Sequence, residues 1–159
     1  MLIEIAQVHE IDTILALIEE LLAELGEEGQ EFAGIDREKL HTDIGRNLGS
    51  GRFVALLARD DSGAAIGVLT LSESFALYAG GEYGVIDEMY VRPSFRSCGI
   101  GRQLVDAAVT IARQRRWYRL DVTGPEHPGP EGGRGRQAVR FYESLGFEFT
   151  GPKMRLLVS

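Results

Sequence analysis

The heptapeptide Arg96-Ser97-Cys98-Gly99-Ile100-Gly101-Arg102 lies where a strand-like run ends and an amphipathic helix begins. Glycines at such a junction let the backbone approach a ligand closely, and the first turn of the helix offers free N–H groups at the positive end of its dipole. Phosphate is the natural ligand of this arrangement, and Arg96 and Arg102 would supply counter-charge to a diphosphate. Ordinary glycines at a helix start are the simpler interpretation. The dinucleotide and P-loop motifs do not match, because Leu104 replaces the third glycine of the first and Arg102 the lysine of the second.

The length of the chain, 159 residues, and its hydrophobic pattern are typical of one mixed α/β domain. Hydrophobic spacing predicts helices over 11–25, 36–48, 100–116 and 136–145, and strands over 2–6, 53–59, 65–77, 83–91, 117–122, 147–150 and 154–158. The order is βααβββαβαββ. The strand over 83–91 does not alternate cleanly, which predicts a bulge near Asp87, and bulges are frequent beside active sites. The strand over 117–122 follows a helix and is expected to lie parallel in the same sheet.

Composition excludes several classes of protein. Hydrophobic residues make up 44% of the chain, enough for a packed core, and the single cysteine, Cys98, excludes an intrachain disulfide. The three histidines show no ligand spacing, so we expect no metal. The sequence begins without the features of a secretory signal and holds no apolar run of membrane-spanning length, so we expect a cytoplasmic protein that does not bind membranes.

Charge is distributed unevenly along the chain. The net charge is −7, but residues 1–90 contribute −13 and residues 91–159 contribute +6. The negative total disfavours nucleic acid as a partner, because neutralising phosphates requires a basic surface. The asymmetry favours two small ligands of opposite charge, with the anionic one at the basic end of the chain.

Two further segments, one before and one after the heptapeptide, make the sequence pattern more specific than the heptapeptide alone. Residues 86–93 precede it, and residues 137–147 follow it, ending in Phe141-Tyr142-Glu143-Ser144-Leu145-Gly146-Phe147. Together with Arg96 to Gly101, which matches an R-x-x-G-x-G signature, they resemble the GCN5-related N-acetyltransferase (GNAT) superfamily. The resemblance covers nearly the whole chain in element order. It implies a mixed, mostly antiparallel central sheet flanked by helices. Residues 78–91 are also similar to the corresponding stretch of diamine acetyltransferases.

The resemblance implies acetyl-coenzyme A (acetyl-CoA) as cosubstrate and assigns residues to it. The pyrophosphate would bind the backbone N–H groups of Ser97, Cys98, Gly99, Ile100, Gly101 and Arg102. The pantetheine arm would pair with the strand at Met89, Tyr90 and Val91. Tyr142 would stand near the thiol sulfur. Gly135 is a departure, since many relatives carry a cofactor-binding Asn there, and Arg134, Arg136 or Arg140 are candidates to replace it.

The chemistry of acetyl transfer to an amine gives further roles. An alkyl ammonium of pKa ~10.4 costs roughly 4 to 5 kcal/mol to deprotonate at pH 7, so a general base helps. Asp87 or Glu88 would take the proton, directly or through water. A backbone N–H near Met89, freed by the bulge, would stabilise the oxyanion, and Tyr142 would protonate the leaving thiolate. The alternatives are a solvated acidic pair and a core tyrosine. A covalent route through Cys98 is disfavoured by its place in the phosphate loop.

The acceptor is expected over the acidic part of the chain. Glu28 and Glu31, with Glu27, lie between the first two helices, and Tyr78 and Glu82 lie in the stretch similar to diamine acetyltransferases. A small-molecule or peptide amine would be drawn to this field. The sequence thus predicts an N-acetyltransferase acting in a ternary complex. A non-catalytic acyl-CoA sensor and an interaction domain that binds no cofactor are the alternatives, and a homodimer is possible in any of these cases.

Overall fold

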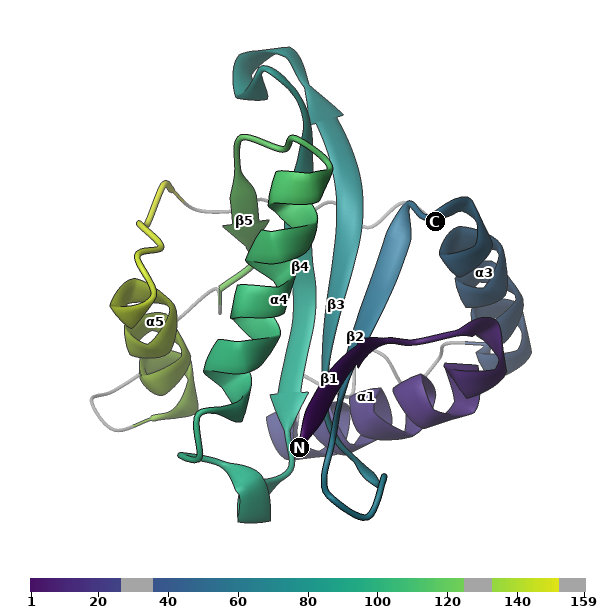
Figure 1. Cartoon of the computed structure of the whole chain (residues 1–159). Coiled ribbons are helices and arrows are strands. Elements are labelled where there is room, and N and C mark those ends of the chain that lie inside the picture. The colour runs from purple at the N-terminus through teal and green to yellow at the C-terminus, as the bar shows by residue number, and fades with distance from the viewer. Residues whose placement is uncertain (27–35, 125–132, 152–159) are drawn as a thin grey trace. The chain divides into compact units, whose positions relative to one another are not determined.

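The computed structural model describes residues 1–26, 36–124 and 133–151. Its central sheet has five strands in the order β1-β2-β3-β4-β5 (Figure 1). The strands are β1 (Leu2–Ile5), β2 (Phe53–Arg59), β3 (Ala65–Ala76), β4 (Gly81–Val91) and β5 (Leu120–Val122). The first four pair in antiparallel fashion with their sequence neighbours, so they form a meander. The chain divides into two units, Met1–Asp121 and Val122–Ser159.

Helices of the first unit cover both faces of the sheet. They are α1 (Ile11–Leu25), α3 (Arg37–Ser50) and α4 (Ile100–Gln114), with single turns at Val8–Glu10, Leu77–Ala79 and Pro93–Phe95. Ile14 and Leu17 of α1 belong to one buried cluster with Ala55 and Leu57 of β2. Because side chains alternate along a strand, the buried Val54 and Leu56 face the other way. Helix α4 contacts β2, β3 and β4, and Figure 1 shows it in front of the sheet.

A β-bulge interrupts the β3–β4 ladder. Leu69 faces Met89 and Leu71 faces Ile86, so Asp87 and Glu88 together lie opposite Thr70. This is the bulge that the sequence predicts near Asp87. An extra residue on one strand bends it and re-aims the side chains beside it. The bulge therefore determines how the acidic pair is presented.

The second unit contains one described helix, α5 (Arg134–Ser144). The Gly146 N–H donates to the Glu143 carbonyl and the Phe147 N–H to that of Tyr142, and Gly146 adopts φ 90°. This left-handed residue ends the helix in the way its glycine predicts.

Most of the predicted elements are confirmed, and two differ. The helix over 11–25 and the strand over 53–59 have the predicted bounds, and the mixed, mostly antiparallel fold is confirmed. The strand predicted over 147–150 is wrong, because these residues have no ladder partner among the described residues and Phe149 is 82% exposed. The strand predicted over 117–122 is shorter and begins at Leu120. The strand predicted over 154–158 lies outside the described residues.

Candidate active site

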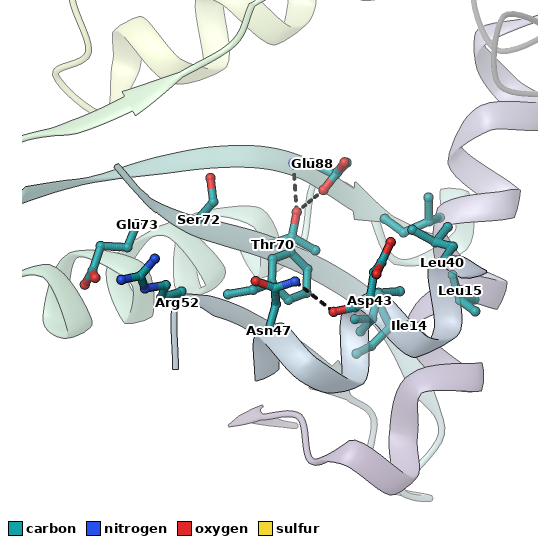
Figure 2. Close-up of a pocket in the computed structure, with 13 residues that line it drawn as sticks. Ile14, Leu15, Leu40, Asp43, Asn47, Arg52, Thr70, Ser72, Glu73 and Glu88 are labelled. Carbon is teal, nitrogen blue, oxygen red and sulfur yellow. Dashed lines mark hydrogen bonds between the residues drawn. The ribbon is translucent and has the colours of Figure 1, made fainter. Parts of the chain in front are cut away.

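A hydroxyl group holds the acidic pair of the bulge in place. The Glu88 N–H, which the bulge removes from the ladder, donates to Thr70 Oγ1 at 3.0 Å, and the same hydroxyl donates to Glu88 Oε2 (Figure 2). Thr70 is only 1% exposed. A buried hydroxyl that accepts one hydrogen bond has its own hydrogen left to give, so its direction is determined. The carboxylate of Glu88 is therefore oriented by its own backbone through Thr70.

Glu88 and Asp87 lie in different surroundings. Asp87 is exposed, whereas Glu88 is half-buried. Burial raises the pKa of Glu88, the hydrogen bond from Thr70 lowers it, and the charge of Asp87 raises it again, with a net rise. A carboxylate whose pKa is raised toward neutrality is a better general base than an ordinary one. The two acids are thereby distinguished, which the sequence left open.

Glu88 lines a cavity of about 490 Å³ between α1, α3 and the sheet. Its other lining residues are Ile14, Leu15, Ile18, Leu40, Asp43, Ile44, Asn47, Arg52, Phe53, Thr70, Ser72 and Glu73. The volume is in the range of small-molecule sites, and a mainly apolar wall with a few polar groups is typical of them. Sequence reasoning missed Thr70 and Arg52. The one sequence signal that could have pointed to Thr70 is the presence of a threonine within the apolar run of β3.

The heptapeptide forms a loop with unpaired backbone donors. Gly99 adopts φ 79° and Ser97 φ 61°, and α4 begins at Ile100 without a side-chain cap. In the described part of the chain, no group accepts a hydrogen bond from the N–H groups of residues 97–102. Several adjacent donors at the positive end of a helix suit a phosphate group. The loop therefore fits the pyrophosphate that the resemblance places there.

The arginines of this loop have protein partners. Arg96 donates to the Val91 carbonyl at 2.7 Å and to the Glu24 carboxylate at 2.8 Å, and it lies over the Tyr90 ring. Arg102 is exposed and stands 4.0 Å from Asp106. Arg96 thus joins the loop to β4 and α1, and its role as counter-charge to a diphosphate stays a prediction.

The strand residues assigned to the pantetheine arm differ in exposure. Tyr90 is buried, and its hydroxyl donates to Glu24 at 3.1 Å. Burial, with the acceptor Glu24 next, raises its pKa to about 12. The side chain of Tyr90 is therefore structural, and a ligand of this strand would use its backbone. Met89 and Val91 are half-buried.

Tyr142 lies on α5 in the second unit. Its ring meets those of Phe141 and Phe147 edge to face, at centroid distances of 5.2 and 5.4 Å. Burial raises the pKa of its phenol to about 12, so the hydroxyl stays protonated at neutral pH. Gly135 and the three candidate arginines lie on the same helix.

The residues predicted to attract the acceptor are only partly described by the structure. Glu27, Glu28 and Glu31 lie outside the described residues. Tyr78 is exposed at the turn between β3 and β4, Glu82 is exposed near the start of β4, and neither is among the described residues that line the cavity. Their role in substrate binding stays a prediction. Cys98 is exposed on the phosphate loop.

A bulged strand followed by a helix whose N-terminus offers free donors is an α/β arrangement that suits an anionic ligand. The sequence profile of the acetyltransferase (GNAT) domain matches residues 51–149, and the chain belongs to this family. Over 66 residues the chain is 33% identical to the peptidyl-lysine N-acetyltransferase YjaB of Escherichia coli, covering 42% of this chain and 37% of that protein. None of the described helices is long and apolar enough to cross a bilayer.

Solved structures share the fold at low sequence identity. A predicted acetyltransferase of Clostridium acetobutylicum, solved with acetyl-CoA, has a TM-score of 0.77 at 20% identity, covering 98% of this chain and 95% of that chain. The ribosomal-protein-alanine N-acetyltransferase of Brucella melitensis has a TM-score of 0.72 at 18% identity, covering 100% and 99%. The aminoglycoside 6'-N-acetyltransferase AAC(6')-IG of Acinetobacter haemolyticus has 0.71 at 19% identity, also covering 100% and 99%. At this identity, the likeness shows the fold alone.

Proposed function

We propose that this protein transfers the acetyl group of acetyl-CoA to a primary amine by direct attack in a ternary complex. The observation that carries the proposal is the Glu88 carboxylate, which lines the cavity and is oriented by Thr70 at the bulge of β4. Family membership supports the class of reaction, and the acceptor is a small-molecule or peptide amine.

Glu88 acts as the general base in this proposal. Burial raises its pKa toward the range in which a carboxylate exchanges protons with a substrate, and it lines the cavity into which an ammonium group would bind. There it takes one proton from the ammonium, directly or through a water molecule, and leaves the neutral amine that the reaction needs. Asp87, exposed beside it, raises the pKa of Glu88 through its charge.

The phosphate loop holds the cosubstrate. Backbone N–H groups of residues 97–102 bind the pyrophosphate, and Arg102 adds a positive charge at the same end of α4. When bound, acetyl-CoA supplies an activated acetyl thioester. The backbone of Met89 to Val91 orients the pantetheine arm by strand pairing, and an N–H near Met89 as oxyanion donor stays a prediction.

Tyr142 acts as the general acid in this proposal. Its phenol is protonated at neutral pH, which is the state required to donate a proton to the departing thiolate. A phenol of pKa near 12 is a weak acid against a thiol of pKa ~8.5, so the hydrogen bond to the developing thiolate contributes before the proton moves. This role rests on the family resemblance of residues 141–147.

A turnover screen with acetyl-CoA tests the function. Polyamines, amino sugars, amino acids and peptides are offered at pH 8, and released thiol is followed. We expect turnover with at least one amine and none from Gly101→Glu, whose carboxylate occupies the phosphate loop. Gly49→Glu is the matched control, because a side chain built there meets nothing within 4 Å.

Two other results of these experiments would favour one of the alternative functions, a sensor or an interaction domain. Binding of coenzyme A without thiol release from any amine would contradict the enzyme and indicate a sensor. No rise in Tm with coenzyme A would contradict cofactor binding altogether and indicate an interaction domain.

A further inference from the structure

Four charged side chains line the cavity, and two of them are neutralised by neighbours. Asp43 pairs with Lys39 and with Arg46, the latter at 3.8 Å. Glu73 lies 3.4 Å from Arg115, which also donates to the Gly51 carbonyl. These two carboxylates are therefore poor sites for a cationic substrate, because each already has a counter-charge.

The other two charged groups are Glu88 and Arg52. Glu88 is hydrogen-bonded to Thr70 and has no cationic partner among the described residues. Arg52 is exposed, and its guanidinium has neither an ion pair nor a hydrogen bond with any described residue. The cavity thus presents one unpaired negative and one unpaired positive charge.

These two charges lie at different places along the wall. Glu88 is held by Thr70, whereas the carbonyl of Arg52 accepts the Glu73 N–H at 2.8 Å, three residues further along β3. Three strand residues span roughly 10 Å, so the backbones of the two charged residues are set apart along the wall. Figure 2 shows Arg52, Ser72 and Glu73 on one side of the lining residues and Leu15 and Leu40 on the other, with Thr70 and Glu88 between.

Apolar side chains supply most of the exposed wall of the cavity, and Asn47, Thr70 and Ser72 add uncharged polar groups to it. The apolar lining residues are Ile14, Leu15, Ile18, Leu40, Ile44 and Phe53. A linker of methylene groups would be buried favourably there, whereas a sugar with many hydroxyl groups would lose hydrogen bonds to water without finding equal partners.

We infer that the acceptor is an amine that carries a carboxylate at the far end of an apolar linker, with its amine at Glu88 and its carboxylate at Arg52. This inference rests on the proposed function. It distinguishes among amines, because a diamine of the same length would place its second ammonium group at the guanidinium of Arg52. A neutral alkylamine would leave that guanidinium unpaired.

Three probes of equal length test the inference: 6-aminohexanoate, hexylamine and hexane-1,6-diamine. For the wild-type protein we expect kcat/KM to fall in that order, by about fivefold or more at each step, which is the scale of one partly exposed ion pair. Arg52→Gln should remove the preference for the carboxylate. Arg52→Glu should invert it, so that the diamine becomes the best of the three.

Arg113→Gln is the matched control, because Arg113 is exposed at the end of α4 and does not line the cavity. It should keep the wild-type order. A wild-type preference for hexylamine or the diamine, or an unchanged order in Arg52→Glu, would overturn the inference while leaving the acetyltransferase proposal intact. Thiol release from no amine at all would overturn both.

Discussion

Thr70 shows how one side chain can link fold and chemistry. Aromatic residues apart, it is the one buried polar side chain among the residues that the structure describes, and its hydroxyl bonds both the backbone and the carboxylate of Glu88. Because the bulge places two residues opposite Thr70, the hydroxyl replaces a missing ladder partner. The same group that completes the sheet therefore orients the candidate base.

Replacing Glu88 by glutamine removes the candidate base at nearly constant shape. We expect kcat to fall by about 10²-fold or more, because general base catalysis contributes on that scale. Steady-state rates of thiol release measure this. A rate close to wild type would assign the base to Asp87 or to water.

The same variant should not be less stable at pH 7. The pKa of Glu88 is higher in the folded protein than its ordinary value, so between these two pKa values the folded state binds more protons. Stability therefore falls as the pH rises through that window, and the ionised group costs stability above it. Thermal unfolding of Glu88→Gln at pH 7 should give a Tm equal to or above that of the wild type.

Thr70→Val keeps the shape of residue 70 and removes its hydroxyl. Since the hydrogen bond from Thr70 lowers the pKa of Glu88, its loss should raise that pKa and shift the acidic limb of the kcat/KM profile to higher pH. The Glu88 N–H would lose its acceptor, at a cost of about 1–3 kcal/mol in unfolding free energy. Thr70→Ser should restore the pH profile, and a Thr70→Val profile that coincides with wild type would exclude a positioning role.

Tyr142→Phe tests the general acid. The substitution keeps the ring that meets Phe141 and Phe147, so packing should be preserved. We expect kcat to fall by about 10- to 100-fold. Circular dichroism during thermal unfolding is the control for folding. Wild-type turnover by a folded Tyr142→Phe protein would contradict the assignment.

At the scale of elements, close packing at Gly84 joins β4 to the segment before β5. A Cβ on Gly84 would lie 2.5 Å from Trp117 Cζ3 and 2.6 Å from Leu120 Cδ2, and Trp117 is buried. Gly84→Ala should therefore lower the free energy of unfolding by about 1–3 kcal/mol. Gly49→Ala, in an open helical position, should change it by no more than about 1 kcal/mol in the stabilising direction. Chemical denaturation of both variants measures the difference, and equal stabilities would contradict the packing.

Elements were predictable where the signal is local. The apolar residues of 11–25 repeat with helical spacing, and Asp36 accepts hydrogen bonds from the N–H groups of Glu38 and Lys39 as an N-cap should. The bulge was also visible, because it breaks the alternation of β4. Residues 147–150 form no strand with any residue that the structure describes, and local hydrophobicity alone does not supply the partner that a strand requires.

The site was predictable only in part, because its geometry depends on contacts distant in sequence. The contact between Thr70 and Glu88 depends on the register of two strands, and no spacing in the sequence gives that register. Arg52 follows the turn after α3 and resembles any exposed arginine until the cavity is seen. The loop over 96–102 could be predicted because its glycines and the helix that follows them are adjacent in the sequence.

At the scale of the whole molecule, the charge asymmetry is partly internal. Acidic residues of α1 bind arginines from the end of β4 and from the phosphate loop, as Glu20 does with Arg92 and Glu24 with Arg96. Part of the negative charge of residues 1–90 thus stabilises the packing of α1 and is not offered to a substrate. The unpaired charges of the cavity are a better guide to the acceptor than the net charge.

The ratio of thiol released to amide formed tests acetyl transfer most directly. Wild-type protein is incubated with acetyl-CoA and the best amine of the screen, thiol is followed by absorbance, and the product is quantified by mass spectrometry. An N-acetyltransferase gives one molecule of acetylated amine for each thiol. Thiol release without the amide would show hydrolysis of the thioester. No thiol release at all would show that the protein does not turn over acetyl-CoA. Either result would contradict transfer to an amine.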